Sequence, residues 1–176
     1  MNQITPPNPN EYAEFYAGYV QRAQARAEVL AALPKQIEEI RSIVGNLSDE
    51  QARFKPGPQE WSFKEVVGHL NDGERVFSYR LLRISHNDPT PLPGFEQDDY
   101  VREANFGERT LPDLLEEFEL IRRANLLTFR GISQDASQRQ GTTSGYNISV
   151  RALLYIMAGH VEHHQESLRK DYLPKL

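Results

Sequence analysis

Residues 62–86 read SFKEVVGHLNDGERVFSYRLLRISH, and this stretch decides the fold. Ser62 and Glu65 have the spacing of a capping box, in which two side chains cap backbone N–H groups at the start of a helix. Apolar side chains then recur at intervals of three, four and seven, which is typical of an amphipathic helix: Phe63, Val66, Leu70, Phe77, Leu81 and Ile84. The stretch therefore predicts a long helix with one buried face.

Three further segments have helical character. Residues 11–44 are rich in helix formers but contain Pro34, so either a second helix begins near Pro34 or one long helix kinks there. Pro112 stands where a first helical residue belongs, and that helix is expected to stop at Gly131. Ser149 is expected to cap a last helix that runs to about residue 170.

The connections are expected to be irregular. Residues 87–109 predict a long loop with one helical piece near residues 98–103, and residues 133–147 predict another loop. Ser48 begins a second capping box and a short helical turn. No segment has a convincing strand pattern, so we predict an all-α four-helix bundle with an additional N-terminal helical segment.

The length of 176 residues favours one domain. Residues 1–10 contain three prolines and no apolar pattern, so we expect a flexible leader. Residues 11–176 would form the single domain, with its core at about 33–173.

Composition excludes several classes of protein. The net charge is −5 and no basic block exceeds two residues, which argues against nucleic acid as a partner. The absence of cysteine excludes disulfides and cysteine-based zinc sites or nucleophiles. Neither a signal peptide nor an apolar run of about 20 residues is found, so we expect a cytoplasmic protein with no membrane segment.

The last predicted helix contains the stretch AGHVEHHQESL, residues 158–168, which holds three of the five histidines. With about 100° per residue, His160 lies at the edge of the apolar stripe and His164 lies inside it. His163 lies about 60° from His160, on the side away from the stripe. In the helix over residues 62–86, His69 also lies at the edge of the stripe. The pair at i and i+4 is a spacing that helical metal sites use.

Each histidine also has a plainer interpretation. A lone histidine beside an apolar stripe is more often a hydrogen-bonded, half-buried residue than a ligand. His163 is interpreted as solvated or supporting, and His86 as a surface residue at a helix C-terminus. Glycines flank the candidates, at Gly68, Gly73 and Gly159. Each costs about 1 kcal/mol relative to alanine in a helix, which would be useful where another group must approach closely.

The combination of Trp61-Ser-Phe-Lys-Glu-Val-Val-Gly-His69 with His160-Val-Glu-His-His164 resembles the DinB-like superfamily. The resemblance covers residues 33–173, and the stretch PTPLPGFEQDDY at 89–100 is similar to one uncharacterised branch. It implies a metal-binding four-helix bundle, with a divalent ion, zinc or nickel, held by His69, His160 and His164. It also implies a homodimer. Relatives include small-thiol S-transferases, a thiol-dependent isomerase and proteins named as metal-dependent hydrolases.

Three imidazoles leave a divalent ion its full charge and an open position, so water or a thiol bound there becomes a nucleophile. Without cysteine, a thiol must come from a low-molecular-weight cosubstrate. Arg80 lies about 20° from His69 around its helix. It is expected either to pair with an acid of the loop or to receive an anionic substrate. Acids that could accept from the imidazoles or lie near the pocket are Asp72, Glu96, Asp98, Asp99 and Glu166.

The sequence thus favours a metal-dependent enzyme acting on a small molecule, as a thiol transferase or a hydrolase. One alternative is a non-catalytic metal-binding stress-response protein, in which the ion staples the bundle. Another is a helical interaction module whose histidines are incidental.

Overall fold

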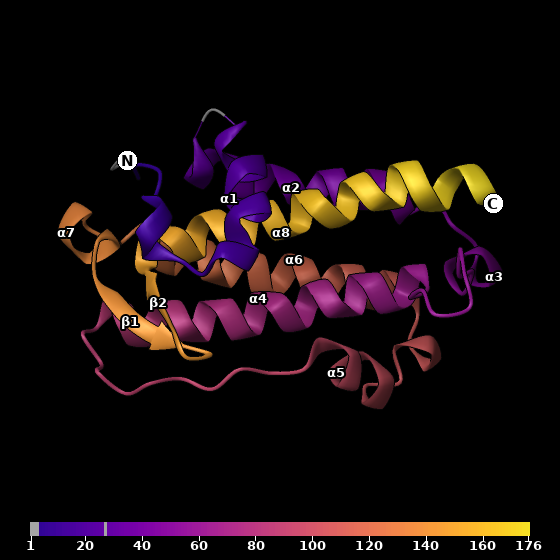
Figure 1. The fold of residues 1–176 in the computed structure, drawn as a ribbon. Coiled ribbons are helices and arrows are strands. Elements are labelled where there is room, and N and C mark those ends of the chain that lie inside the picture. Colours follow the sequence, from indigo (N-terminus) through magenta and orange to yellow (C-terminus); the bar gives the residue numbers. More distant parts are fainter. Residues whose placement is uncertain (1–3, 27) are drawn as a thin grey trace.

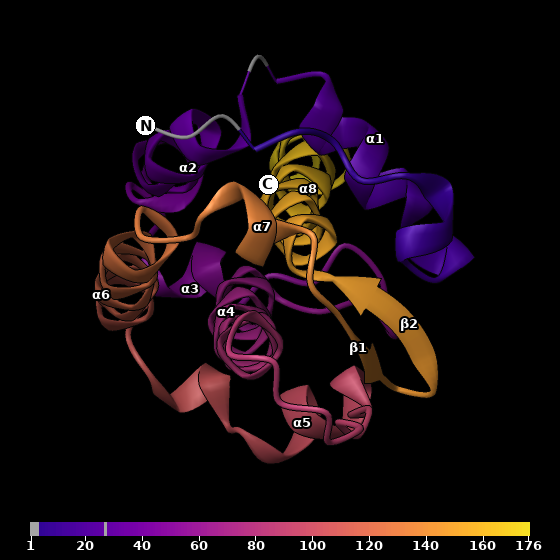
Figure 2. The same ribbon diagram turned by 90° about the vertical axis from the view of Figure 1, so that its left-hand side faces the viewer.

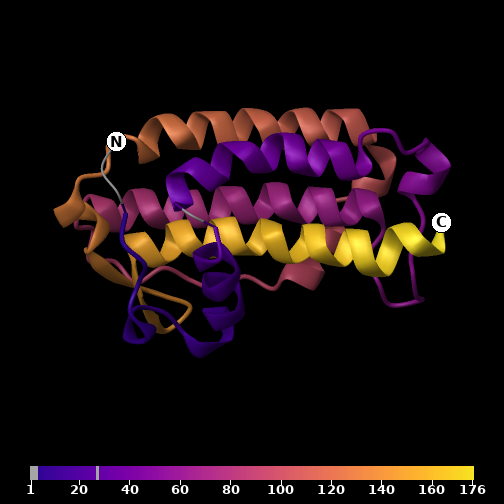
Figure 3. The same cartoon turned by 90° about the horizontal axis from the view of Figure 1, so that it is seen from above.

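The computed structural model describes residues 4–26 and 28–176, and four long helices lying side by side form its main body (Figure 1, Figure 3). These are α2 (Val29–Val44), α4 (Phe63–Ser85), α6 (Leu111–Phe129) and α8 (Val150–Ser167). Both α2 and α4 pack against α6 and α8, which closes the bundle. The predicted four-helix bundle is confirmed. Within the described residues, no helix combines the length and apolar content that crossing a membrane requires.

The helices begin where side chains cap them. Ser62 Oγ accepts from the Glu65 backbone N–H at 3.2 Å, and the Glu65 carboxylate accepts from the Ser62 N–H at 2.6 Å. An equivalent box at Ser48 opens the short helix α3 (Asp49–Ala52). Ser149 caps α8 through the Ala152 N–H. These three helix starts could be predicted because the caps are local in sequence.

The N-terminal helices are divided before Pro34 rather than at it. The first, α1 (Ala17–Gln24), ends several residues before α2, and Pro34 lies inside α2. Glu28 caps α2 by accepting from Leu30 N and Ala31 N at 3.1 Å and 2.7 Å. Glutamate is not among the preferred capping residues, so the sequence did not reveal this start.

Two residues of the expected flexible leader, Ile4 and Pro7, are buried, whereas the other residues from 5 to 10 are exposed. Ile4 is 1% exposed and its carbonyl oxygen accepts from Tyr155 Oη at 3.1 Å. A 3-10 turn follows at Pro9–Glu11 and another at Glu14–Tyr16. The rest of the expected leader, residues 1–3, lies outside the described residues. The sequence did not predict this burial, because Ile4 packs into an apolar site formed by residues that are distant in the sequence.

The N-terminal segment covers the side of α8 that faces away from the bundle core, as Figure 2 shows for α1. The apolar stripe expected for this helix consists of Leu153, Met157, Val161 and Leu168, and all four are buried. Residues between them are buried too, among them Leu154, Tyr155, Ile156 and Ala158. Helix α8 is therefore buried on all sides over much of its length. The additional segment completes the core by covering this second face.

At Gly159 the backbone of α1 lies close against α8, since a β-carbon there would lie 1.8 Å from the Tyr19 carbonyl oxygen. We expect Gly159→Ala to destabilise the protein by about 1–3 kcal/mol because backbone must shift, which lowers the Tm by several degrees. Gly107→Ala is the control, because its β-carbon would meet nothing nearer than Arg53 Nη1 at 3.7 Å. Equal Tm values for the two variants would contradict the close contact.

A hairpin replaces part of the loop expected at 133–147, so the prediction of no strand was wrong. After the short helix α7 (Gln134–Ser137), strand β1 (Gln140–Thr143) pairs antiparallel with β2 (Tyr146–Ser149). The turn uses Ser144 and Gly145 at φ of 53° and 83°, the left-handed conformation that such two-residue hairpin turns need. The strands are short and mostly polar, which hid them from periodicity.

The long loop after α4 is confirmed, together with its helical piece α5 (Gln97–Glu103). The loop is attached to the hairpin: Leu92 N donates to Thr142 O, and Ser144 N donates to Leu92 O, both at 2.9 Å. Figure 1 shows the loop running along α4 from the hairpin to α5. A 3-10 turn at Phe106–Glu108 follows α5. Loop and hairpin together therefore wall one side of α4.

A buried polar network joins the four long helices. Arg122 of α6 donates to both carboxylate oxygens of Glu74 of α4, at 2.9 Å and 2.6 Å. Its Nη1 donates to Leu33 O and Gln36 Oε1 of α2. Gln36 Nε2 in turn donates to Ala158 O of α8 at 2.8 Å. The network therefore fixes α8 two residues before His160.

Candidate metal centre

Three histidines from two helices meet between α4 and α8. His69 comes from α4, and His160 and His164 come from successive turns of α8. One ring nitrogen from each lies within 4.8 Å of the others, and His69 Nε2 lies 2.8 Å from His160 Nε2. The structure thus brings together the three residues that helical periodicity selected.

The electrostatics of the cluster favour neutral imidazoles. Burial, together with the charge of His163, lowers the pKa of His69 to about 4. Burial and the neighbouring histidines hold the pKa values of His160 and His164 well below their usual range. A neutral imidazole keeps a lone pair free for a metal. Three such nitrogens without a carboxylate ligand suit a divalent transition-metal ion better than magnesium or calcium.

Aromatic side chains hold the three rings in place. The Trp61 ring lies 4.7 Å from that of His69 and stacks on His164 at 6.3 Å between centroids. Tyr19 and Phe77 present their rings to His160 at 5.5 Å and 5.7 Å. This packing limits ring rotation, so the cluster is preorganised before any ligand binds.

Two of the flanking glycines make room for rings. A β-carbon at Gly73 would lie 2.9 Å from His160 Cε1, and one at Gly68 would lie 2.4 Å from the Phe106 ring. The expectation that these helical glycines permit close approach is therefore met. At Gly73 the approaching group is one of the three histidines.

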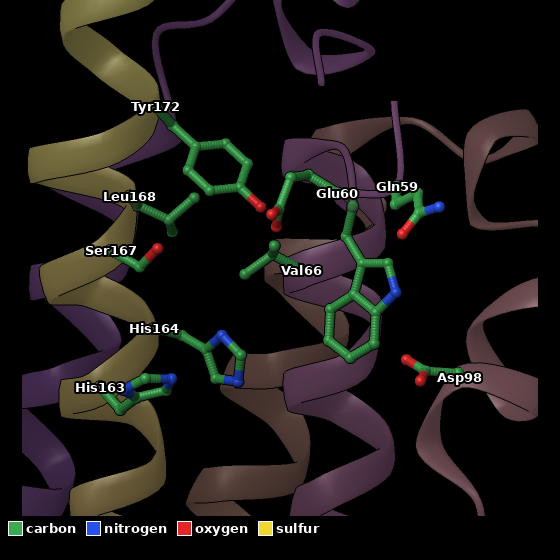
Figure 4. A pocket seen from close by; sticks show the side chains of 10 residues that line it. Gln59, Glu60, Val66, Asp98, His163, His164, Ser167, Leu168 and Tyr172 are labelled. Carbon is green, nitrogen blue, oxygen red and sulfur yellow. The ribbon is translucent and has the colours of Figure 1, made fainter. Parts of the chain in front are cut away.

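Two cavities reach the cluster. The smaller, of about 260 Å³, is lined by His163 and His164 with Trp61, Asp98 and Tyr172 (Figure 4). The larger, of about 480 Å³, is lined by His69 and His160 and continues along α4 to Arg80. Asp98 lines both. The cluster can therefore be reached from two sides.

His163 stays outside the cluster, as its position on the helix predicted. Its ring lies 5.0 Å from that of His164 and 5.4 Å from that of Tyr19. It is half-buried, and burial together with Arg22 lowers its pKa. His86 is exposed at the C-terminus of α4, as expected.

The acids expected to accept from the imidazoles do not do so. Among the described residues, no hydrogen bond joins a ring nitrogen of the cluster to any of these five acids, Asp72, Glu96, Asp98, Asp99 and Glu166. Glu166 pairs with Arg22 and Lys170 on the surface, and Asp99 pairs with Arg102. Asp72 is half-buried, and burial raises its pKa. Of the five acids, Glu96 and Asp98 lie near the candidate site, because both line the larger cavity.

Arg80 does not pair with an acid of the loop. It is 2% exposed, and its Nη2 donates to Pro93 O at 2.9 Å and to Ser144 Oγ at 3.1 Å. The loop is held by its backbone and by the hairpin serine instead. The expected pairing of Arg80 with a loop acid is therefore wrong, and the other interpretation, that Arg80 receives an anionic substrate, remains.

Tyr19 and Tyr172 were missed as site residues. Tyr19 comes from the N-terminal segment, whose place beside α8 carries no local signal except the glycine at position 159. Tyr172 lies in a π-turn at Leu168–Tyr172 that continues α8, which helical periodicity does not describe.

Metal-free protein is expected to lose stability as the pH falls from 7 to 5. An unfolded histidine takes up a proton near 6.5, whereas folded His69 does so only near its pKa of about 4, so unfolding binds protons in this window. That pKa difference corresponds to about 3 kcal/mol in full. The measurement is Tm against pH in the presence of chelator. A His69→Phe variant should show a flatter profile, and an unchanged profile would contradict burial as neutral imidazole.

Comparison with known proteins supports the architecture. A family model described as the DinB superfamily matches residues 32–168. No curated protein matches the chain. A solved structure, YfiT from Bacillus subtilis, superposes with a TM-score of 0.72 at 13% identity, covering 95% of this chain and 91% of YfiT. YfiT is described as having an unusual four-helix bundle topology. The shared fold therefore extends into the N-terminal segment that precedes the family match.

Proposed function

This chain belongs to the DinB superfamily, and from that premise we propose that it is a metal-dependent enzyme acting on a small molecule. The observation that carries the proposal is the convergence of His69, His160 and His164 within 4.8 Å, with cavities on two sides. We take zinc or nickel as the ion, because the donors are three imidazole nitrogens.

Each side chain of the site has a defined task. His69, His160 and His164 would hold the ion through neutral ring nitrogens, and three such ligands leave a position open. When bound there, a divalent ion would lower the pKa of a water molecule or small thiol and so supply a nucleophile near neutral pH. Trp61, which lines the smaller cavity, and Phe77, which lines the larger one, keep the rings oriented. The chain itself provides no thiol, since it has no cysteine.

Transfer of a small thiol is the reaction that this arrangement supports best. Two reactants need two binding regions, and the cluster faces a cavity of about 260 Å³ and another of about 480 Å³. The smaller one, polar at Glu60, Asp98 and Ser167, suits a low-molecular-weight thiol. The larger, aromatic one suits the electrophile. In the reaction the thiol loses its proton, a new S–C bond forms, and the leaving group departs from that carbon.

Hydrolysis is the second candidate. The smaller cavity is polar enough to admit water beside His164. YfiT is described as a probable metal-dependent hydrolase, although a likeness at 13% identity shows the fold alone.

The test is turnover by protein purified without a histidine tag or nickel column. We expect thiol-dependent product formation from a panel of small thiols and electrophiles. It should be lost on chelation, restored by added zinc or nickel, and absent in His160→Ala. His86→Ala, at an exposed position, is the matched control. Hydrolysis of esters or amides without thiol would select the second candidate. A bound ion that raises Tm without any turnover would overturn both and support a stapling role.

A further inference from the structure

Arg80 offers a buried positive charge with part of its hydrogen-bonding capacity unused. The residue is 2% exposed, and Nη2 is held by Pro93 O and Ser144 Oγ. Its Nη1 is buried and has no hydrogen-bond partner, and no acid of the described residues forms an ion pair with it. Both of its partners are neutral. The guanidinium therefore keeps an uncompensated charge and a free donor.

The other deeply buried guanidinium shows how this chain satisfies such a group. Arg122 is 0% exposed, and Glu74 accepts two hydrogen bonds from it, while its Nη1 is taken up by α2. Leaving a buried charge unpaired costs several kcal/mol. Arg122 is fully paired, whereas Arg80 has no acidic partner among the residues that the structure describes. The position beside Arg80 can therefore accept an anionic ligand.

The surroundings of Arg80 do not neutralise it. Tyr16 lies on the same cavity beside Arg80, and burial raises the pKa of its phenol more than the neighbouring guanidinium lowers it, so the phenol stays uncharged. Glu96 and Asp98 line the cavity too, but both are exposed and neither forms an ion pair with Arg80. The hairpin residue Ser144 fixes the arginine without adding charge.

Arg80 shares its cavity with the histidine cluster. The space of about 480 Å³ is lined by His69 and His160 as well as by Arg80. Half of the residues that line the wall between them are aromatic: Phe15, Tyr16, Tyr19, Phe77, Phe95 and Tyr146. A ligand there would meet aromatic rings along part of its length and a cation at one end.

The helix sets the length of such a ligand. His160 packs against Gly73, and Arg80 follows seven residues later on the same helix. At 1.5 Å per residue the two positions are about 10 Å apart along the axis. A benzene ring with a chain of five or six carbon atoms has about this length.

We propose that the larger cavity binds an elongated organic carboxylate, with its carboxylate paired to Arg80, its apolar or aromatic body along the aromatic wall and its reacting end at the histidine cluster. The reaction at that end rests on the proposed function, whereas binding of the anion does not. A charge-assisted hydrogen bond to a buried arginine contributes about 1.5–3 kcal/mol, or about tenfold to a hundredfold in affinity.

The test compares 6-phenylhexanoate with its uncharged amide, by calorimetry, in zinc-loaded and in metal-free protein. Wild type should bind the carboxylate at least about tenfold more tightly than the amide. Arg80→Gln should lose this preference, while Arg80→Lys should retain part of it. Arg83→Gln is the matched control, because Arg83 lies on the same helix, pairs with Asp88 and does not line the cavity.

The outcomes separate the anion site from the enzyme. A preference for the carboxylate that persists in metal-free wild type and disappears in Arg80→Gln supports the proposal, whether or not turnover is ever observed. A preference that disappears on chelation would assign the carboxylate to the ion and overturn it. Equal binding of acid and amide by wild type, or an unchanged preference in a folded Arg80→Gln, would also overturn it. Circular dichroism establishes whether each variant is folded. If Arg80→Gln does not fold, the carboxylate preference of Arg80→Lys is compared with that of wild type instead.

Discussion

His160→Ala is expected to lower the affinity for zinc by more than about a hundredfold and to abolish turnover. Loss of a residue that only supports a ligand already costs about 10–100-fold, and this change removes one of three nitrogens. The ring is 4% exposed and packed by Tyr19 and Phe77, so water cannot simply replace it. The measurement is zinc affinity by competition with a chromogenic chelator.

The neighbouring histidines provide the comparison. His69→Ala should behave like His160→Ala, whereas His163→Ala should keep zinc affinity within a fewfold because its ring lies outside the cluster. His160→Asn, which leaves a smaller cavity, separates loss of the nitrogen from loss of packing. Undiminished zinc binding by folded His160→Ala would show that the cluster is not the metal site.

Glu74→Ala is expected to destabilise the protein by about 3–5 kcal/mol, the usual cost of removing one partner of a buried ion pair. The change leaves the Arg122 guanidinium charged inside the bundle, where its side chain is 0% exposed. For a chain of this length the loss corresponds to a fall in Tm of roughly 10 °C. Thermal unfolding by circular dichroism measures it.

Two further variants make this prediction specific. Asp99→Ala breaks the exposed pair with Arg102 and should leave Tm unchanged, since surface pairs contribute little. The double variant Glu74→Leu, Arg122→Met removes both charges and should be more stable than Glu74→Ala alone. If Glu74→Ala melts with wild type, the network does not hold the helices together.

Much of the fold and of the candidate site could be predicted because the signals are local. Ser62 and Glu65 are three residues apart, so the start of α4 is visible in one turn of sequence. His160 and His164 share a face of α8 for the same reason, since residues four apart are neighbours on a helix. His69 was added because it lies at the edge of the apolar face of its own helix.

The missed features depend on contacts distant in sequence. Ser144 and Gly145 form a hairpin turn whose strands are too short for periodicity to detect. The free donor of Arg80 appears only when its surroundings are complete, because Pro93 and Ser144 occupy one nitrogen and no acid reaches the other. The two cavities likewise exist only between elements.

The sequence alone determined that this chain is a helix bundle carrying three histidines on inward faces, because helical periodicity and capping are set by residues within one or two turns. Only the tertiary structure decided that α1 buries the second face of α8 and that two cavities meet at the histidines. It also decided that Arg80 is buried beside the larger cavity without a counter-ion. Which surfaces meet is set by packing between segments up to about 150 residues apart, such as Ile4 and Tyr155, and no local pattern encodes it.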